Sequence, residues 1–410
     1  MNDFRRKVTE ATTAMRALFE PTPLQHNLYL SAKYGAEIWL KREDLGPVRS
    51  YKLRGALTAM KAALDGGATG PFICASAGNH AQGVAFAAQH FGVQAVVFMP
   101  VTTPDQKIAK TRAFGGEFIE IRLTGDIFDA ALKSAQEYCA QLNGRFLPPF
   151  DDEQVMIGQA SVAVEIAAQL GSLPDMLVLP VGGGGLAGGV TRYFGDACSY
   201  RFIEPAGATS LAAALAAGGP VTLPAVDNFV DGAAVARIGA LNFAALAPFT
   251  QADCMAVSED RLCETMIDML NVEGVVLEPA GALAIDALRD MPDIAGKRIV
   301  CLVSGGNFDF ERLPDVKERA MRSAGLKKYF VLRMPQRPGA LKEFLNLLGP
   351  DDDIARFEYL KKSARNFGSV LIGIETHDPA SFPAFTQRMR DAGFSFQDIT
   401  DNQMLANFIV

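Results

Sequence analysis

The sequence predicts an α/β protein built on wound parallel sheets, followed by a smaller α+β domain. Between about residues 70 and 310, short apolar runs alternate with longer amphipathic segments, which is the pattern of repeated βαβ units. From about residue 327 the order changes to β-α-β-β-α-β, which is that of a ferredoxin-like domain. The change of order indicates more than one domain in the 410 residues.

In the first part, strands are expected where the apolar runs are nearly continuous, because strands covered on both faces lose the alternation of polar and apolar residues. These runs are 71–75, 95–99, 117–120, 176–180, 200–203 and 298–303. Helical spacing of Ala, Val, Ile and Leu predicts helices at 81–91, 104–114, 127–142 and 157–170. The loop L-P-P-F-D-D at 147–152 interrupts this alternation and is a candidate crossover between subdomains.

In the second part, strands are predicted at 329–332, 354–360, 369–375 and 396–399, and helices at 341–348 and 379–392. The charged stretch 315–322, followed by Ser-Ala-Gly, is the expected joint between the two parts. We therefore expect a first domain over 1–322, with a small subdomain at about 47–150 inserted in it, and a second domain over 327–410.

Composition narrows the class of protein. Hydrophobic residues make up 49% of the chain and charged residues 21%, an ordinary balance for a globular enzyme. The formal net charge of -7, without a Lys/Arg-rich block, argues against nucleic-acid partners. No apolar run approaches the roughly 18 residues of a membrane span, and the N-terminus lacks a secretory pattern, so we expect a cytoplasmic protein without membrane partners. The six cysteines are scattered without a C-x-x-C pair, which favours buried reduced thiols over disulfides or zinc ligands.

The cluster Gly182, Gly183, Gly184 and Gly185 directly follows an apolar strand and precedes a helix. Backbone N–H groups at such a helix N-terminus bind anions, so a phosphate would fit there. One alternative is a flexible turn. A second is a dinucleotide fold, because G-x-G-x-x-G also fits and Glu204 ends the next strand about 20 residues on.

Two further polar segments follow predicted strands. S-A-G-N-H at 76–80 and S-G-G-N at 304–307 each offer a hydroxyl, an amide and free backbone donors at the carboxyl end of a strand, where open α/β sheets bind ligands. The alternative for each is a plain helix cap. Lys52, in S-Y-K-L-R-G-A, would by itself be read as a surface lysine.

Together these segments resemble the fold-type II pyridoxal-phosphate enzymes, and within that group the biosynthetic threonine dehydratases (threonine ammonia-lyases). K-R-E-D-L, S-Y-K-L-R-G-A, S-A-G-N-H, G-G-G-G-L and S-G-G-N match in order and spacing over about the first 320 residues. The C-terminal segment resembles the ACT-like regulatory domain of those enzymes, present once. The resemblance implies a tryptophan synthase β-like fold with pyridoxal 5'-phosphate as cofactor.

By this resemblance, Lys52 is the Schiff-base lysine and catalytic base, Asn79 faces the phenolic oxygen of the ring and Ser304 faces its pyridine nitrogen. The phosphate is held by Gly182, Gly183, Gly184, Gly185 and Leu186. The substrate carboxylate is bracketed by Ser76, Ala77, Gly78, Asn79 and His80. Racemase-like relatives bind a divalent cation through a Glu and an Asp six residues on. Here those positions are Glu204 and Ser210, so no metal is expected.

The implied activity is β-elimination of L-threonine, and of L-serine less well, to 2-oxobutanoate or pyruvate and ammonia, the first step of isoleucine biosynthesis. Serine racemase and threonine synthase share the scaffold and are the nearest alternatives. An inert amino-acid-sensing protein and a nicotinamide-dependent oxidoreductase are alternatives of other classes. The resemblance also implies isoleucine and valine as opposing effectors and a homodimer or homotetramer.

Overall fold

The structure, a computed structural model, describes residues 3–360 and 366–402. Contacts within the chain divide it into two compact units, Met1–Asp309 and Phe310–Val410. Helix α13 (Leu313–Ser323), which covers the expected joint, lies in the second unit. The two units are described separately below.

A six-stranded sheet forms the larger part of the first unit, in the order β1-β2-β10-β7-β8-β9. Only the pair β1 and β2 is antiparallel, and the other neighbours in this sheet run parallel. The strands are β1 (Leu24–His26), β2 (Glu37–Arg42), β7 (Met176–Pro180), β8 (Ser199–Pro205), β9 (Cys254–Val257) and β10 (Arg298–Val303). This order is not that of a dinucleotide-binding sheet, 3-2-1-4-5-6.

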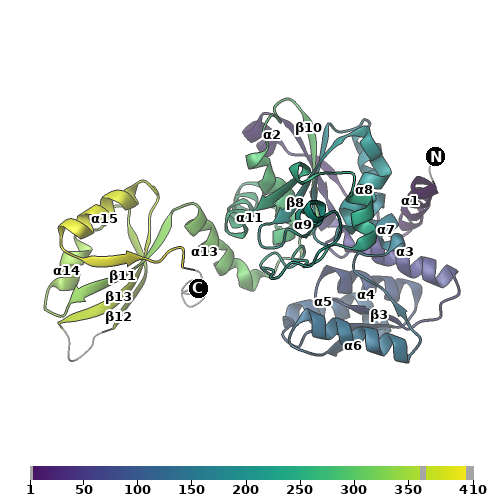
Figure 1. The fold of residues 1–410 in the computed structure, drawn as a ribbon, viewed down its shortest axis with the longest axis horizontal. Helices are drawn as coiled ribbons and strands as arrows, with labels where there is room; N and C mark the ends of the chain where they lie inside the picture. The colour runs from purple at the N-terminus through teal and green to yellow at the C-terminus, as the bar shows by residue number, and fades with distance from the viewer. Residues whose placement is uncertain (1–2, 361–365, 403–410) are drawn as a thin grey trace. The chain divides into compact units, whose positions relative to one another are not determined.

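Helices pack on this sheet and bury its apolar strands, as Figure 1 shows for α8, α9 and α11. They are α1 (Asp3–Met15), α2 (Leu28–Tyr34), α7 (Glu153–Leu170), α8 (Gly185–Phe194), α9 (Ser210–Ala217), α10 (Ala240–Leu246), α11 (Glu259–Glu273) and α12 (Pro279–Asp286). Leu177, Phe202 and Val300 of the sheet share one core with Ile166 and Val190 of the helices.

The smaller part of the first unit is a four-stranded parallel sheet in the order β5-β4-β3-β6. Its strands are β3 (Phe72–Ala75), β4 (Ala95–Met99), β5 (Ile119–Leu123) and β6 (Arg145–Phe146). Its helices are α3 (Lys52–Asp65), α4 (Asn79–Phe91), α5 (Asp105–Gly115) and α6 (Phe128–Gln141). Successive side chains of a strand point to opposite faces. Accordingly Phe72 and Cys74 join one core with α3 and α4, while Ile73 and Ala75 join another with α6.

Most strands lie where the apolar runs predict them. The strand expected at 117–120 begins later, at Ile119, because Gly116–Phe118 forms a 3-10 turn. The apolar pattern did not indicate β1, β2 or β9. Strand β2 ends on Lys41 and Arg42, charges that are buried in the fold and that a search for apolar runs passes over.

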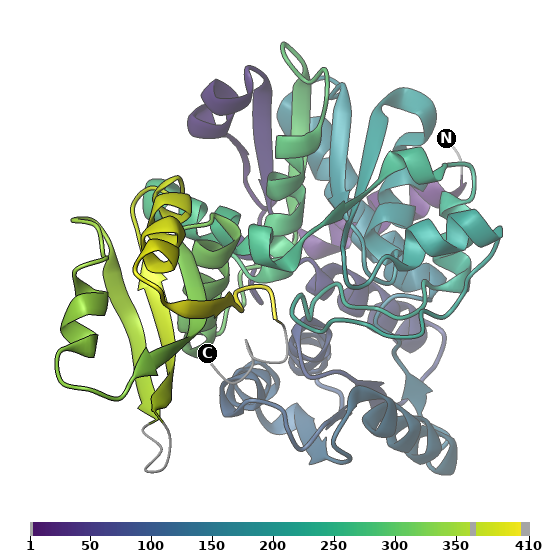
Figure 2. The same ribbon diagram turned by 60° about the vertical axis from the view of Figure 1, so that its left-hand side comes forward.

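The second unit confirms the predicted β-α-β-β-α-β order. After α13 come β11 (Lys327–Pro335), α14 (Ala340–Leu345), β12 (Asp353–Leu360), β13 (Phe367–Glu375), α15 (Ser381–Asp391) and β14 (Ser395–Asp398). The antiparallel sheet has the ferredoxin-like order β12-β13-β11-β14. Figure 2 shows this sheet with its two helices, whose Phe344 and Phe385 pack with Phe330 of the central strand.

Within residues 3–360 and 366–402, no helix has the length and apolar character that crossing a membrane requires. All six cysteines are free thiols. Four of them are buried as expected, whereas Cys198 and Cys254 are partly exposed.

Candidate active site

Lys52 is the first residue of α3, where it is partly buried while its ammonium is surrounded by protein. Its Nζ donates to the Pro149 carbonyl oxygen at 2.9 Å. In the described part of the chain Lys52 forms no ion pair, and desolvation lowers the pKa of its ammonium to about 8, although the charge of Glu278 opposes this shift. An amine that is readily deprotonated near neutral pH is suited to nucleophilic and basic chemistry. The interpretation of Lys52 as a surface lysine is therefore wrong.

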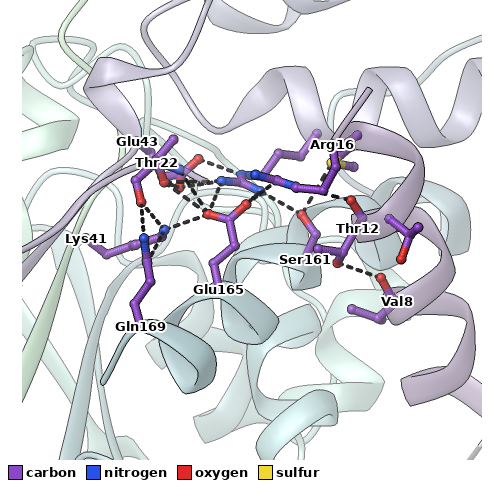
Figure 3. A network of polar contacts seen from close by, with 12 residues as sticks. Val8, Thr12, Arg16, Thr22, Lys41, Glu43, Ser161, Glu165 and Gln169 are labelled. Carbon is purple, nitrogen blue, oxygen red and sulfur yellow. Dashed lines mark hydrogen bonds and ion pairs between the residues drawn. The ribbon is translucent and has the colours of Figure 1, made fainter. Parts of the chain in front are cut away.

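The residues that follow Lys52 fix its helix in place (Figure 3). The Arg54 guanidinium donates to Glu43 at 2.7 Å and to Glu165 of α7 at 2.8 Å, and Lys41 donates to Glu165 at 2.6 Å. Burial by itself raises the pKa of Glu165, but the charges and hydrogen bonds of Arg54 and Lys41 outweigh burial and lower the pKa to about 2. A Cβ atom at Gly158 of α7 would collide with the Arg54 carbonyl, so α3 and α7 touch through their backbones.

The glycine loop connects β7 to the N-terminus of α8. Gly184 has φ +85°, a conformation that favours glycine. Cβ atoms at Gly182 and Gly183 would meet the Ala233 backbone and the Phe150 ring. Phe150 follows Pro149, the partner of Lys52, so one short segment contacts both the lysine and the glycine loop. The first N–H groups of α8 lack partners within the helix and offer an anion site.

The S-A-G-N-H segment joins β3 to α4. Gly78 occupies the N-cap position of α4 without a side-chain cap, so neither Ser76 nor Asn79 is the plain cap that the alternative required. Ser76 Oγ accepts a bond from the Gly78 N–H at 3.2 Å. Asn79 Nδ2 donates to Glu278 Oε1 at 2.7 Å, and Asn79 Oδ1 accepts from Asn307 Nδ2 at 2.8 Å.

His80 is placed for a structural role. Its Nε2 lies 2.9 Å from the Leu147 carbonyl oxygen, to which only a protonated nitrogen can donate. Burial, with the nearby charge of Lys52, lowers the pKa of His80 to about 4, so the imidazole is neutral. The His80 side chain thus anchors the 147–152 loop, and only its backbone is available to a substrate.

The S-G-G-N segment after β10 contacts the residues before Lys52. The Ser304 carbonyl accepts from the Tyr51 N–H at 3.2 Å, and Gly305 forms an isolated bridge with Ser50. Asn307 Nδ2 also donates to the Val48 carbonyl at 2.8 Å. Ser304 itself is buried. The three predicted segments and Lys52 are thus linked by direct contacts.

Sequence reasoning missed Glu278 and the roles of Phe150 and Asn307. Glu278 precedes Pro279 at the start of α12, and this pattern reads as an ordinary helix N-terminus. Phe150 lies in the crossover loop, where no pattern connects it to glycines more than 30 residues away. Asn307 lay inside a predicted segment, but its partners come from distant parts of the chain.

Glu204 is not the solvated strand end considered from the sequence. It is 1% exposed, and its carboxylate accepts from the Leu211 and Ala212 N–H groups of α9 at 2.6 and 3.0 Å. Burial raises the pKa of Glu204 to about 7 despite these bonds. Both oxygens are engaged within the protein, which also removes the acidic residue that a dinucleotide site would present to a ribose.

The donor set fits pyridoxal phosphate. Lys52 supplies an amine that no described carboxylate holds in an ion pair, as attack on an aldehyde requires. The α8 N-terminus supplies free N–H groups for a phosphate, and Asn79 Nδ2 keeps a second proton beside its bond to Glu278.

Comparisons with known proteins agree with this fit. Residues 15–305 match the family described as "Pyridoxal-phosphate dependent enzyme", and residues 318–409 match "C-terminal regulatory domain of Threonine dehydratase". The chain is 45% identical over 394 residues to the L-threonine dehydratase biosynthetic IlvA of Bacillus subtilis (strain 168), covering 95% of this chain and 93% of that protein. It is 44% identical over 388 residues to the protein of the same name from Mycobacterium bovis, covering 93% and 90%.

Solved structures give the same result for the fold. Threonine deaminase isoform 2 from Solanum lycopersicum, in its processed form, matches with a TM-score of 0.72 and 35% identity over 78% of this chain and 94% of that chain. A bacterial threonine deaminase, from T.th., matches with a TM-score of 0.68 and 31% identity over 74% and 98%. This chain therefore belongs to the pyridoxal-phosphate dependent enzyme family, in the group that carries the C-terminal regulatory domain of threonine dehydratase.

Proposed function

We propose that the chain is an L-threonine dehydratase, which converts L-threonine to 2-oxobutanoate and ammonia and accepts L-serine as a poorer substrate. The observation that carries the proposal is the desolvated ammonium of Lys52, which no described carboxylate pairs with. It lies beside a glycine loop and an amide donor, in a chain that resembles dehydratases over both units. The product places the enzyme at the start of isoleucine biosynthesis.

In this proposal Lys52 anchors the cofactor and then accepts the Cα proton of the substrate. Pyridoxal phosphate, when bound, supplies the electron sink that acidifies that proton. The phosphate is held by the backbone N–H groups of Gly182, Gly183, Gly184, Gly185 and Leu186. Asn79 Nδ2 donates to the phenolic oxygen, and the N–H groups of residues 76–80 hold the substrate carboxylate.

Ser304 is proposed to lie beside the pyridine nitrogen. A neutral hydroxyl does not hold a full positive charge on that nitrogen, unlike a carboxylate. The weaker electron sink favours prompt loss of the β-hydroxyl over a long-lived carbanion. This is our reason for preferring elimination to the racemase alternative.

The second unit is proposed to bind isoleucine as an inhibitor and valine as its antagonist. A single ferredoxin-like unit per chain would form an effector site by pairing with a second copy, so we propose a homodimer or homotetramer. The cytoplasmic location expected from the sequence stays a prediction.

The test is the release of 2-oxo acid from L-threonine by purified protein. The Lys52→Ala variant should lose at least about a thousandfold in turnover, because it lacks both the anchor and the base. It should also lose the visible absorption band of the bound cofactor. The matched control is Lys61→Ala, since Lys61 lies on the same helix, is half exposed and pairs with Asp65 one turn away. Wild-type protein that binds the cofactor but leaves threonine unchanged would refute the proposed activity.

A further inference from the structure

The side chain of Asn79 is held from both ends. Its nitrogen donates to Glu278 Oε1 at 2.7 Å, and its oxygen accepts from Asn307 Nδ2 at 2.8 Å. Asn307 Nδ2 spends its other proton on the Val48 carbonyl, also at 2.8 Å. Asn307 therefore presents a nitrogen to Asn79 and cannot turn its amide without losing both bonds.

Counting protons shows what this arrangement fixes. Asn79 Nδ2 has two protons, and Glu278 takes one, so one remains for a further acceptor. If the Asn79 amide were reversed, its oxygen would face the oxygen of Glu278, and its nitrogen would face the nitrogen of Asn307. Both contacts would be repulsive. The acceptor at position 278 therefore selects which atom of Asn79 is free to meet a ligand.

The packing around Glu278 leaves little freedom for another arrangement. The residue is 6% exposed and precedes the first turn of α12. A Cβ atom at Gly305 would collide with Glu278 Oε1, and one at Gly281 would collide with the Gly305 carbonyl. The glycine next to Ser304 thus makes room for the carboxyl group of Glu278. This gives Gly305 a packing role beyond backbone freedom.

The charge of Glu278 is compatible with an acceptor beside a cofactor oxygen. Burial raises the pKa of Glu278 to about 7, and Asp231 acts in the same direction, while Asn79, Lys107 and the Asn307 backbone oppose it. A carboxyl group that is readily neutral keeps an acceptor oxygen without a permanent negative charge.

We propose that Glu278 is a positioning residue, which orients the Asn79 amide so that its second N–H faces the ring oxygen of the cofactor. The inference rests on the proposed function only in taking Asn79 as a cofactor contact. It assigns no contact between Glu278 and the substrate.

The experiment compares Glu278→Ala with Glu278→Gln in the full chain. The dissociation constant of pyridoxal phosphate is measured by equilibrium dialysis, and the visible circular dichroism of the bound cofactor reports its orientation. Glu278→Ala should raise the dissociation constant about tenfold, in the range expected when one partner of a buried hydrogen bond is removed, and should reduce the dichroism. Glu278→Gln keeps an acceptor oxygen and should stay within about threefold of wild type in affinity, with its dichroism retained.

The matched control is Glu273→Ala, because Glu273 accepts an equivalent bond from the Asn27 side chain at 2.7 Å at the N-cap of α2. It should leave both cofactor readouts unchanged. If Glu278→Ala does not fold, Asn307→Leu removes the bond at the other end of Asn79 and should weaken cofactor binding in the same direction. Wild-type affinity and dichroism in Glu278→Ala, or in Asn307→Leu where that variant replaces it, would overturn the proposal, as would equal defects in Glu278→Ala and Glu278→Gln. Failure of the proposed activity would instead appear in wild-type protein, as cofactor binding without threonine turnover.

Discussion

At the scale of single residues, the environment of Lys52 determines its chemistry. The protein replaces water around the ammonium and provides one carbonyl oxygen, from Pro149, as its hydrogen-bond partner. The negative charge of Glu278 favours the ammonium, but desolvation is the larger effect, so the pKa falls from 10.5 to about 8. At pH 8 about half of the Lys52 side chains would be neutral, against roughly one in 300 for a free lysine.

The rate at which the cofactor-free protein binds pyridoxal phosphate covalently should therefore depend on pH with a midpoint near 8. Only the neutral amine attacks an aldehyde, so the rate should rise through this pH and level off above about 9. Stopped-flow absorbance measures the rate, and Nα-acetyl-lysine, with its ordinary pKa, is the control. A midpoint near that of the control would contradict the desolvated environment of the ammonium.

The sequence predicted the candidate site residues that lie in local motifs at strand ends, such as Asn79 and Ser304. It could do so because a strand followed by Gly, Ser or Asn places these residues at a predictable sheet edge. Glu278 and Phe150 were not predictable in this way, because their roles come from contacts with residues 199 and 33 positions away, Asn79 and Gly183. The reason for the glycines was also incomplete, since the Phe150 ring and the Ala233 backbone exclude side chains at Gly183 and Gly182.

At the scale of elements, helix α3 is held by a buried ionic network as well as by apolar packing. Glu165, 4% exposed, receives bonds from Arg54, Lys41 and Arg16, which come from three different parts of the chain. Breaking such a network by removing one partner leaves buried charges uncompensated. The sequence shows these residues only as scattered charges, which is why it placed no element at β2.

Glu165→Gln should lower the free energy of unfolding at pH 7 by about 3 kcal/mol, as expected when one partner of a buried ion pair is lost. The folded-state pKa of Glu165, about 2, lies below its ordinary value of 4.5, so its stabilisation is present above pH 4.5 and is lost as the pH falls towards 2. Urea denaturation should therefore show the difference between wild type and variant shrinking between pH 5 and pH 3.

Glu10→Gln, on the exposed face of α1 where Glu10 pairs with Arg6, is the control and should change stability little. A Glu165→Gln variant as stable as wild type at pH 7 would show that the network is dispensable.

At the scale of the whole molecule, the chain combines a unit that carries the candidate site with a ferredoxin-like unit. In the second unit both helices share one core with the sheet. The side chains of Val331 and Leu371, which are paired in register, point to the opposite face and are partly exposed. A sheet face of this kind is available to a second copy or to a small effector.

Isoleucine at millimolar concentration, the weak end of ligand affinities, should inhibit threonine turnover by the full chain. A variant that ends at Asp309, the boundary of the first unit, should keep turnover but lose the response. Steady-state assays with and without isoleucine make the comparison, with alanine as the control amino acid. A full chain that ignores isoleucine would leave the second unit a role in assembly alone.

The convergence of distant segments on one site has a consequence for how the protein is maintained in solution. Lys52, Asn79 and the glycine loop belong to parts of the first unit that are built on two different sheets, so an unfolded chain offers no comparable receptor. A ligand that binds only the native state shifts the folding equilibrium by mass action, by about 2.7 kcal/mol at a free concentration one hundred times its dissociation constant. The vitamin-derived cofactor would thus act as a conformational stabiliser, and vitamin supply would set the lifetime of the polypeptide as well as its catalytic capacity.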